Sequence, residues 1–284
     1  MKRILVILHI YYHDQVDYFI DKLKNINGCE WKLIVTYSTP DEATFRKIKT
    51  LRPDAILMPA ENVGYDVWPF IKVIKSIDIQ EYDYIMKLHT KNTSVAKHRI
   101  NGITLRGATW RNILVDSILK SRKHFLKCLE ILNNDPQIGM LCSYELLKGT
   151  SVRLPEDNIL LQREARRIGL NAECKMFCAG TMFIVKPSCL NTIKKAQLDH
   201  YSWGTETRSH SKATLAHVYE RIFGSVVSES GMKIKGITPY PLNSLRTSIH
   251  KSLSPALKSI ITIDRYAIDG KKRLTVFGKK FPLE

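Results

Sequence analysis

The N-terminal third of the chain alternates between strand-like and helix-like hydrophobic patterns, and this alternation limits the possible folds more than any other feature. Four short apolar runs have the length and composition of buried strands: residues 3–12, 32–38, 54–60 and 82–89. Apolar residues recur at helical spacing in residues 15–26 and 68–77, and Pro40, Asp41 and Glu42 favour a helix start. Strands and helices that alternate at this rhythm form βαβ units, so we predict an α/β fold with a mainly parallel sheet flanked by helices.

The remainder of the chain is less regular. The pattern predicts one long helix or two over residues 107–134, strands over 138–143 and 180–187, and a helix over 211–224 that Gly224 ends as its C-cap. The chain has 284 residues, of which 44% are hydrophobic and 25% are charged. This composition suits one large globular domain or one and a half, and it excludes a disordered chain.

Composition also bears on location. No apolar run approaches the roughly 20 residues that a membrane-spanning helix needs. The opening residues 1–14 resemble a signal peptide, but the apolar stretch is short, contains His9 and is followed by no small-residue cleavage site. We therefore predict that this segment is the first buried strand and that the protein stays in the cytoplasm.

The six cysteines are expected to be reduced core thiols. None forms a CxxC pair, and Cys174 and Cys178, four residues apart, have neither a second pair nor an HxxxH sequence to complete a zinc site.

The charge predicts an anionic partner or surface without naming it. The net charge is +17, and residues 242–284 hold nine Lys or Arg against three acids, with apolar residues between them. Nucleic acid, anionic lipid and a nucleotide diphosphate all fit such a charge, and so does a merely solvated basic face. The basic C-terminal extension either contacts an anionic membrane or packs as a helix on the core.

Candidate ligand-binding residues follow the predicted strands, because ligands of open α/β sheets bind beyond the carboxyl ends of the strands. Three of the four segments after the strands carry ionisable side chains, and residues 37–39 offer only hydroxyls. In "ENVGYDVWPF" (61–70), Gly64 permits a tight turn and Asn62 can bond the turn's backbone. Asp66 either contacts a ribose or sugar hydroxyl or caps the following helix.

The stretch "YIMKLHTKNT" (84–93) is unusual because a buried strand runs out into His89 and Lys91 with no carboxylate beside them. A lysine at a strand's carboxyl end can neutralise a phosphate oxygen, and a histidine can donate a hydrogen bond or titrate near neutral pH. The alternative is a surface loop with a solvated lysine.

Two later segments are further candidates. Ala179 and Gly180 precede a predicted strand, where a glycine permits either close approach of a ligand or a bulge. His217, Glu220 and Arg221 share one predicted helix face, which is either solvated or contains a general base with its partner.

The segments "HIYY", "ENVGYDVWPF", "YDYIMKLHTK", "AGTMFIVKP" and "HVYERIFG", in this order over residues 3–225, resemble the rhamnan synthesis F family of bacterial surface-polysaccharide proteins. The resemblance implies a GT-A-like glycosyltransferase fold with a Rossmann-like nucleotide-sugar half (1–135), an acceptor half (136–240) and a basic C-terminal extension (241–284). It also implies a role in assembling lipopolysaccharide O-antigen or a related glycan.

The chain is more distantly similar to family 2 glycosyltransferases, in which an Asp-x-Asp motif binds a metal after a strand. Here "LHTK" stands in that place and no Asp-x-Asp occurs in the chain; Glu81-Tyr82-Asp83 has the spacing but precedes the strand. We therefore hypothesise metal-independent transfer, with Lys91 and His89 as fixed cations that stabilise the diphosphate leaving group, helped by Arg99, Arg106 or Arg111. Glu220 is the expected general base, although Arg221 follows it where the similar enzymes have Asp, and Asp66 or Glu206 could substitute.

The resemblance assigns three sets of site residues. Catalysis is expected from Glu220, Asp66 and His217. Nucleotide-sugar binding is expected from His9, Tyr11, Glu61, Asn62, Gly64, His89, Lys91 and Arg221. Acceptor binding is expected from Ala179, Gly180 and Thr181.

The expected partners are a nucleotide-sugar donor of the rhamnose or galactofuranose class, a polyprenyl-linked glycan acceptor, and the anionic inner face of the cytoplasmic membrane. No cofactor is expected; a divalent metal could be accommodated but is not predicted. A non-catalytic module that binds nucleotide sugar or glycan is the main alternative, favoured by the missing metal-binding acids. A nucleic-acid-binding protein is suggested by charge alone, since no helix-turn-helix, RNP-like or zinc spacing is present.

Overall fold

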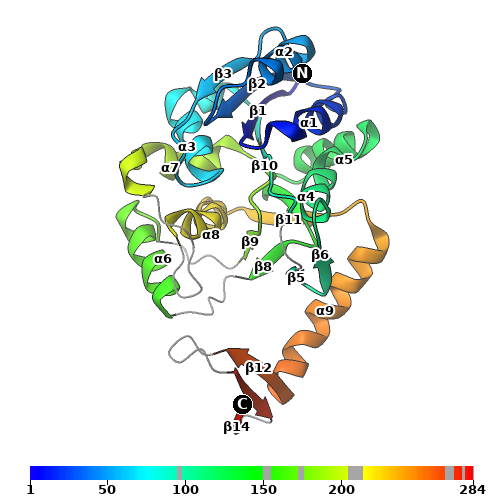
Figure 1. The fold of residues 1–284 in the computed structure, drawn as a ribbon, viewed down its shortest axis with the longest axis vertical. Coiled ribbons are helices and arrows are strands. Elements are labelled where there is room, and N and C mark those ends of the chain that lie inside the picture. Colours follow the sequence, from blue (N-terminus) through cyan, green and yellow to red (C-terminus); the bar gives the residue numbers. More distant parts are fainter. Residues whose placement is uncertain are drawn as a thin grey trace.

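A seven-stranded sheet in the order β11-β7-β10-β4-β1-β2-β3 forms the centre of the molecule (Figure 1). The computed structural model describes residues 1–94, 98–149, 155–171, 176–203, 214–265, 272–276 and 279–283. The strands are β1 (Arg3–Ile10), β2 (Glu30–Tyr37), β3 (Ile56–Pro59), β4 (Tyr84–His89), β7 (Ile138–Ser143), β10 (Phe183–Val185) and β11 (Lys233–Ile237). Neighbouring strands are parallel except that β10 runs antiparallel to both β4 and β7. The predicted α/β class, with a mainly parallel sheet flanked by helices, is confirmed.

Strand β1 shows why the opening segment is structural. Its residues from Ile4 to Leu8 are almost fully buried, as expected for a parallel strand covered by helices on both faces. The prediction that this segment is a core strand is confirmed. Within the described residues, no helix is long and apolar enough to cross a lipid bilayer.

The described helices are α1 (Val16–Leu23), α2 (Glu42–Leu51), α3 (Val67–Ser76), α4 (Thr109–Leu119), α5 (Arg122–Asn134), α6 (Pro155–Arg167), α7 (Asn191–Lys195), α8 (Leu215–Glu229) and α9 (Pro241–Ile260). The predicted helical segment 107–134 is two helices, because the Ser121 hydroxyl caps α5 by accepting the His124 N–H at 3.2 Å. The prediction that Gly224 ends its helix is wrong: Gly224 is buried inside α8, which continues to Glu229.

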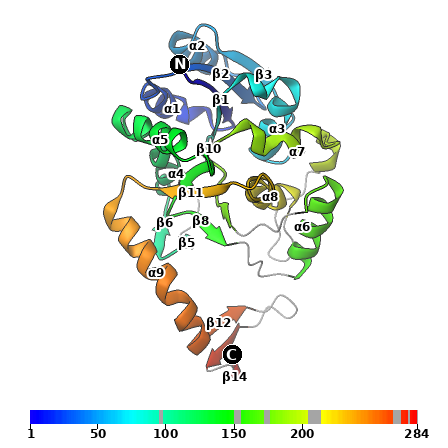
Figure 2. The ribbon, with the colours of Figure 1, turned by 180° about the vertical axis from the view of Figure 1, so that it is seen from behind.

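Smaller elements complete the chain. Strands β5 (His98–Ile100) and β6 (Ile103–Leu105) form a hairpin, and β8 (Leu147–Gly149) pairs with β9 (Met176–Cys178). Short 3₁₀ helices occupy His13–Gln15, Ile79–Glu81, Pro187–Leu190 and His200–Trp203. The predicted C-terminal extension consists of α9 and an antiparallel sheet of β12 (Ile261–Arg265), β13 (Lys272–Val276) and β14 (Lys279–Leu283). Figures 1 and 2 show this part extending away from α2 and β3. The division of the preceding residues into two halves stays a prediction.

The cysteines that the structure describes are free, and all but the half-buried Cys29 lie in the core. Burial raises the pKa of the Cys29 thiol to about 11 and that of Cys128 to about 12, so these thiols are protonated at neutral pH. Cys174 lies outside the described residues.

Candidate functional site

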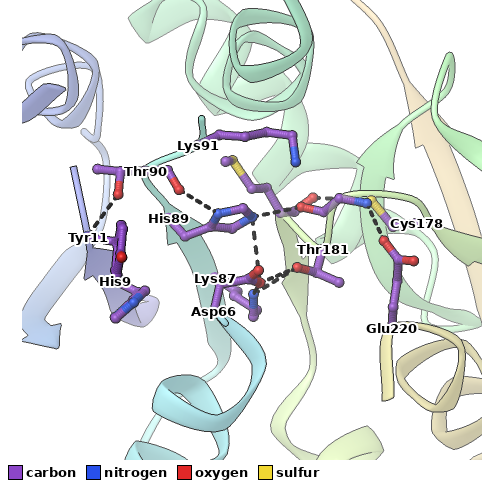
Figure 3. Close-up of polar contacts among 12 residues, drawn as sticks. His9, Tyr11, Asp66, Lys87, His89, Thr90, Lys91, Cys178, Thr181 and Glu220 are labelled. Carbon is purple, nitrogen blue, oxygen red and sulfur yellow. Dashed lines mark hydrogen bonds and ion pairs between the residues drawn. The ribbon is translucent and has the colours of Figure 1, made fainter. Parts of the chain in front are cut away.

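Asp66 lies at the centre of a buried polar cluster (Figure 3). It occupies the position before α3, but its carboxylate forms no capping hydrogen bond. It accepts instead from the Thr181 hydroxyl at 2.5 Å and from the Lys87 ammonium. The capping alternative for its side chain is therefore wrong. Gly64 and Tyr65 precede it with φ of 62° and 52°, a left-handed turn that orients this carboxylate toward the sheet.

Lys87 is the functional candidate that sequence reasoning missed. Its side chain is 1% exposed on β4, and its ammonium donates to Asp66 and to the Thr181 hydroxyl at 2.9 Å. Burial lowers the pKa of Lys87, while Asp66 acts to raise it. Burial opposes ionisation of Asp66, but His89 and Lys87 outweigh it and hold the Asp66 pKa well below its usual range. The available signal was a lysine inside an apolar strand, because charged side chains are buried only with a partner.

The turn before β10 joins this cluster to α8. Gly180 and Thr181 have φ of 93° and 48°, and a Cβ at Gly180 would lie 2.7 Å from Leu114 Cδ1. Gly180 donates its N–H to Glu220 Oε1 at 2.6 Å. Burial raises the pKa of Glu220, and the Gly180 N–H only partly opposes this. Ala179 is buried beside them. The predicted acceptor-binding segment thus lies at the site, although its role stays a prediction.

Hydrogen-bond geometry and burial act in opposite directions on the expected positive charge of His89. Both ring nitrogens lie 2.9 Å from carbonyl oxygens, Nδ1 from Thr90 and Nε2 from Gly180, and Asp66 Oδ2 is 3.6 Å from Nε2. Burial lowers the pKa of His89 to about 4. A carbonyl oxygen only accepts, so a neutral ring donates to one of these two carbonyls and only a protonated ring donates to both. In either state the ring positions the Gly180 turn, and burial favours the neutral form.

Lys91 differs from Lys87 in its partners. It follows β4, and its ammonium lies 3.9 Å from the centre of the Trp110 ring. It forms no ion pair with any carboxylate among the described residues. Gln15 fixes its backbone, donating to the Lys91 carbonyl at 2.7 Å. Figure 3 shows the side chain extending over His89 toward the side of the cluster where Thr181 and Glu220 lie. Burial lowers the pKa of Lys91, and Asp66 and Glu220 act to raise it.

His9 and Tyr11 lie at the end of β1 beside the cluster. His9 is buried and pairs in register with His89 on the neighbouring strand. The Nδ1 atom of His9 is 3.0 Å from the Thr36 hydroxyl, and burial lowers the pKa of His9 to about 4. Tyr11 is half exposed, and the Thr90 hydroxyl accepts its N–H at 2.9 Å. His9 therefore forms part of the floor of the site, and Tyr11 is accessible at its edge.

Other predicted residues have different partners. Glu61 accepts from Trp68 Nε1 at 2.8 Å and from Lys72 at 3.0 Å. Although burial opposes it, these bonds lower the Glu61 pKa to about 2. These two hydrogen bonds hold the turn that contains Asn62, whose side chain is exposed.

On α8, His217 Nδ1 is 2.7 Å from the Thr214 hydroxyl and its ring meets the edge of Tyr65 at 6.0 Å. Arg221 donates to the His217 carbonyl at 2.8 Å and lies over the Phe177 ring. These residues therefore flank the cluster.

The arginines proposed to assist have other surroundings or lie outside the described residues. Arg111 packs 3.7 Å over the Tyr18 ring, and Arg106 is exposed. The Arg99 side chain and Glu206 lie outside what the structure describes.

The cluster does not fit a divalent metal. Among the described residues, no group of three or more His, Cys, Asp and Glu side chains is arranged to hold one. Asp83, from the Glu81-Tyr82-Asp83 sequence, lies at the amino end of β4, where it accepts from the Arg3 N–H at 2.8 Å and pairs with Lys2.

Comparison with known proteins agrees with the sequence motifs. Residues 1–232 match the protein family described as rhamnan synthesis protein F. The chain belongs to the rhamnan synthesis protein F family. Two relatives, each named uncharacterized protein WxcX, come from Xanthomonas campestris pv. campestris strains B100 and ATCC 33913. Each is 26% identical over 249 residues, which is 83% of this chain and 34% of the relative. This family member thus spans about a third of their length.

Two solved structures with a similar trace are reported for comparison. The S. aureus TarS structure (residues 1–349) has a TM-score of 0.42 and 11% identity, covering 79% of this chain and 55% of that one. The mannosyltransferase PcManGT from Pyrobaculum calidifontis, in complex with GDP-Man and Mn²⁺, has a TM-score of 0.38 and 11% identity, covering 90% and 64%.

Proposed function

We propose that this family member is a GT-A-like glycosyltransferase. It would move a sugar of the rhamnose or galactofuranose class from a nucleotide donor to a growing lipid-linked surface polysaccharide. The observation that carries this is Lys91, a largely buried cation beside the carboxyl end of β4 that has no carboxylate partner among the described residues. A buried charge is costly unless it is paired, so the site is suited to an anionic ligand. A nucleotide diphosphate brought to the strand ends would supply that anion.

The neighbouring residues support a division of roles. Lys87 is neutralised by Asp66 and held by Thr181, so it preorganises the floor and leaves Lys91 to meet the phosphates. Glu220 is the proposed general base because, within the described part of the chain, its carboxylate is paired only with the Gly180 N–H and burial raises its pKa. Asp66 is a poorer candidate, because two strong hydrogen bonds and a lowered pKa reduce its basicity.

In the proposed reaction, the acceptor hydroxyl oxygen attacks the anomeric carbon while the bond from that carbon to the diphosphate oxygen breaks. Glu220 takes the hydroxyl proton, and Lys91 stabilises the charge that develops on the leaving diphosphate without a metal. Protonated Glu220 cannot accept the proton, so the rate should rise with pH through its raised pKa. Glu220→Gln should lower transfer by about 10²–10⁴-fold and abolish that dependence.

The first experiment is a thermal-shift screen of dTDP-rhamnose, UDP-galactofuranose, other UDP- and GDP-sugars and the free diphosphates, each with EDTA and with Mn²⁺. Stabilisation in EDTA, followed by sugar transfer from the stabilising donor, supports the proposal. Stabilisation without transfer or hydrolysis supports the non-catalytic binding module, which the absence of an Asp-x-Asp sequence favours. Stabilisation that requires Mn²⁺ would overturn the metal-independent mechanism.

A further inference from the structure

Helix α9 presents a row of large apolar side chains to solvent. Leu242, Leu245, Ile249 and Leu253 are 75%, 58%, 48% and 52% exposed. Their spacing of three, four and four residues places them on one face of the helix. We refer to these four residues as the α9 stripe.

The opposite face holds α9 against the rest of the protein. Thr247 is fully buried, the Ser248 hydroxyl is 3.0 Å from the Tyr144 hydroxyl, and Lys251 donates to the Tyr144 carbonyl at 3.1 Å. The Lys251 ammonium also lies 4.1 Å from the centre of the Tyr144 ring. The helix is thus anchored, and the exposure of the stripe follows from the way it is anchored.

The charge around the stripe is of one sign. Residues 241–260 contain no Asp or Glu. Arg246 and His250 are exposed on the turns of the stripe, and residues 241–284 hold nine Lys or Arg against three acids. An apolar face bordered by cations, with low overall hydrophobicity, is characteristic of helices that lie in the interface of an anionic bilayer.

We propose that α9 docks this protein on an anionic lipid bilayer. The α9 stripe enters the boundary between headgroups and acyl chains, and exposed Arg246 beside it faces the lipid phosphates. Each basic residue near such a surface adds an attraction that salt screens.

A bilayer fits this surface better than a second copy of the chain. A specific protein interface buries about 1,200–2,000 Å², whereas the stripe is a single row of four side chains. Two copies meeting through it would also bring like charges together, with a chain of net charge +17 on each side. A lipid surface does not require a complementary shape, and its phosphates supply the opposite charge.

Helix α9 also contacts the hairpin of β5 and β6. A Cβ added to Gly102, between β5 and β6, would lie 3.2 Å from His250 of α9. The hairpin of β5 and β6 follows Lys91 in the chain. The docking does not rest on the proposed function and is tested without any sugar substrate.

The test is sedimentation of the full chain with sucrose-loaded vesicles of phosphatidylcholine alone or with about a third phosphatidylglycerol. The natural protein should bind the anionic vesicles and lose binding as salt rises. The double variant Leu245→Asp/Ile249→Asp should bind at least about ten-fold more weakly, since each buried aliphatic side chain contributes about that factor. The matched control is Ile159→Asp on α6, which alters another exposed side chain (65%) and should bind like the natural protein.

Circular dichroism and thermal unfolding of each variant verify that it is folded, because exposed positions should tolerate aspartate. Equal binding of the double variant, or no binding by the natural protein at low salt, would overturn the proposal. Self-association that the double variant abolishes, without vesicle binding, would also overturn it and assign the stripe to a second copy. Equal binding to both vesicle types would contradict the electrostatic part.

Discussion

Charged side chains have different surroundings at the two edges of the central sheet. At the amino ends of the parallel strands, Lys2 pairs with Asp83 beside β1 and β4 at 2.9 Å. Arg52 pairs with Asp54 before β3 at 2.8 Å and lies over the ring of Trp31 in β2. Arg3, Trp31, Arg52 and Asp54 line a surface hollow of about 460 Å³ there. At the carboxyl ends, Lys87, Asp66 and Glu220 are packed inside the protein and Lys91 has no ion-pair partner among the described residues.

This contrast teaches that shape alone does not identify the site. The amino-edge hollow is roomy, but its paired charges are at least partly exposed, and such pairs are worth little energetically. The carboxyl edge confines its charges, and its Gly64-Tyr65 and Gly180-Thr181 turns adopt left-handed conformations. Costly burial and unusual backbone in one place are typical of functional sites.

The largest effect should follow from breaking the carboxyl-edge pair. Asp66→Asn leaves the Lys87 ammonium buried without its counter-ion, so the free energy of unfolding should fall by about 3–5 kcal/mol. Urea denaturation measures this change. The double variant Asp66→Asn/Lys87→Met should recover part of the loss, because no unpaired charge remains. A single variant as stable as the natural protein would contradict the buried pair.

The second largest effect should come from acidification, because two buried histidines lie at the carboxyl edge of the sheet. The folded-state pKa of both His9 and His89 is about 4, below the ordinary 6.5. Between these values the unfolded chain binds more protons, so the free energy of unfolding should fall as the pH drops from 6.5 to 4. Each histidine contributes up to about 3 kcal/mol. Urea denaturation across this range should show a smaller fall for His89→Gln.

The control for this pH dependence is His250→Gln, at an exposed histidine. It should unfold with the same pH dependence as the natural protein. Comparing variants with the natural protein also cancels the opposite contribution of Glu220, whose raised pKa makes stability fall as pH rises. An unchanged slope in His89→Gln would mean that this ring is not held neutral by burial.

The smallest effect is expected at the amino edge. Lys2→Ala removes a half-exposed partner of Asp83, so the free energy of unfolding should change by less than about 1 kcal/mol. The same urea titrations measure it. A loss comparable to that of Asp66→Asn would remove the distinction between the two edges.

The strands and helices of the first half could be predicted because their hydrophobic periods are local properties. The antiparallel direction of β10 could not, because it depends on which strands it lies between. The prediction for Gly224 is wrong for a related reason. Its local pattern predicts a helix end, but tertiary packing buries it within α8. Tertiary context overrides the local preference of a glycine.

The candidate site was predictable where chain position alone places a residue at a strand end, as for His89, Lys91 and Asp66. The partners were not predictable, since the contacts of Asp66 with Thr181 and of Glu220 with Gly180 join residues 115 and 40 positions apart. The burial that lowers the pKa of His89 was not predictable either, since it is a property of the folded protein.

The central claim is that Lys91 meets the diphosphate of a nucleotide donor. Calorimetric titration of UDP, GDP and dTDP in EDTA, into the natural protein, Lys91→Ala and Lys2→Ala, tests it most directly. For the diphosphate that binds, Lys91→Ala should raise the Kd by about ten-fold or more, the contribution of one hydrogen bond to a charged group. Lys2→Ala should leave the Kd unchanged. An unchanged Kd in Lys91→Ala, or an equal rise in both variants, would contradict the account.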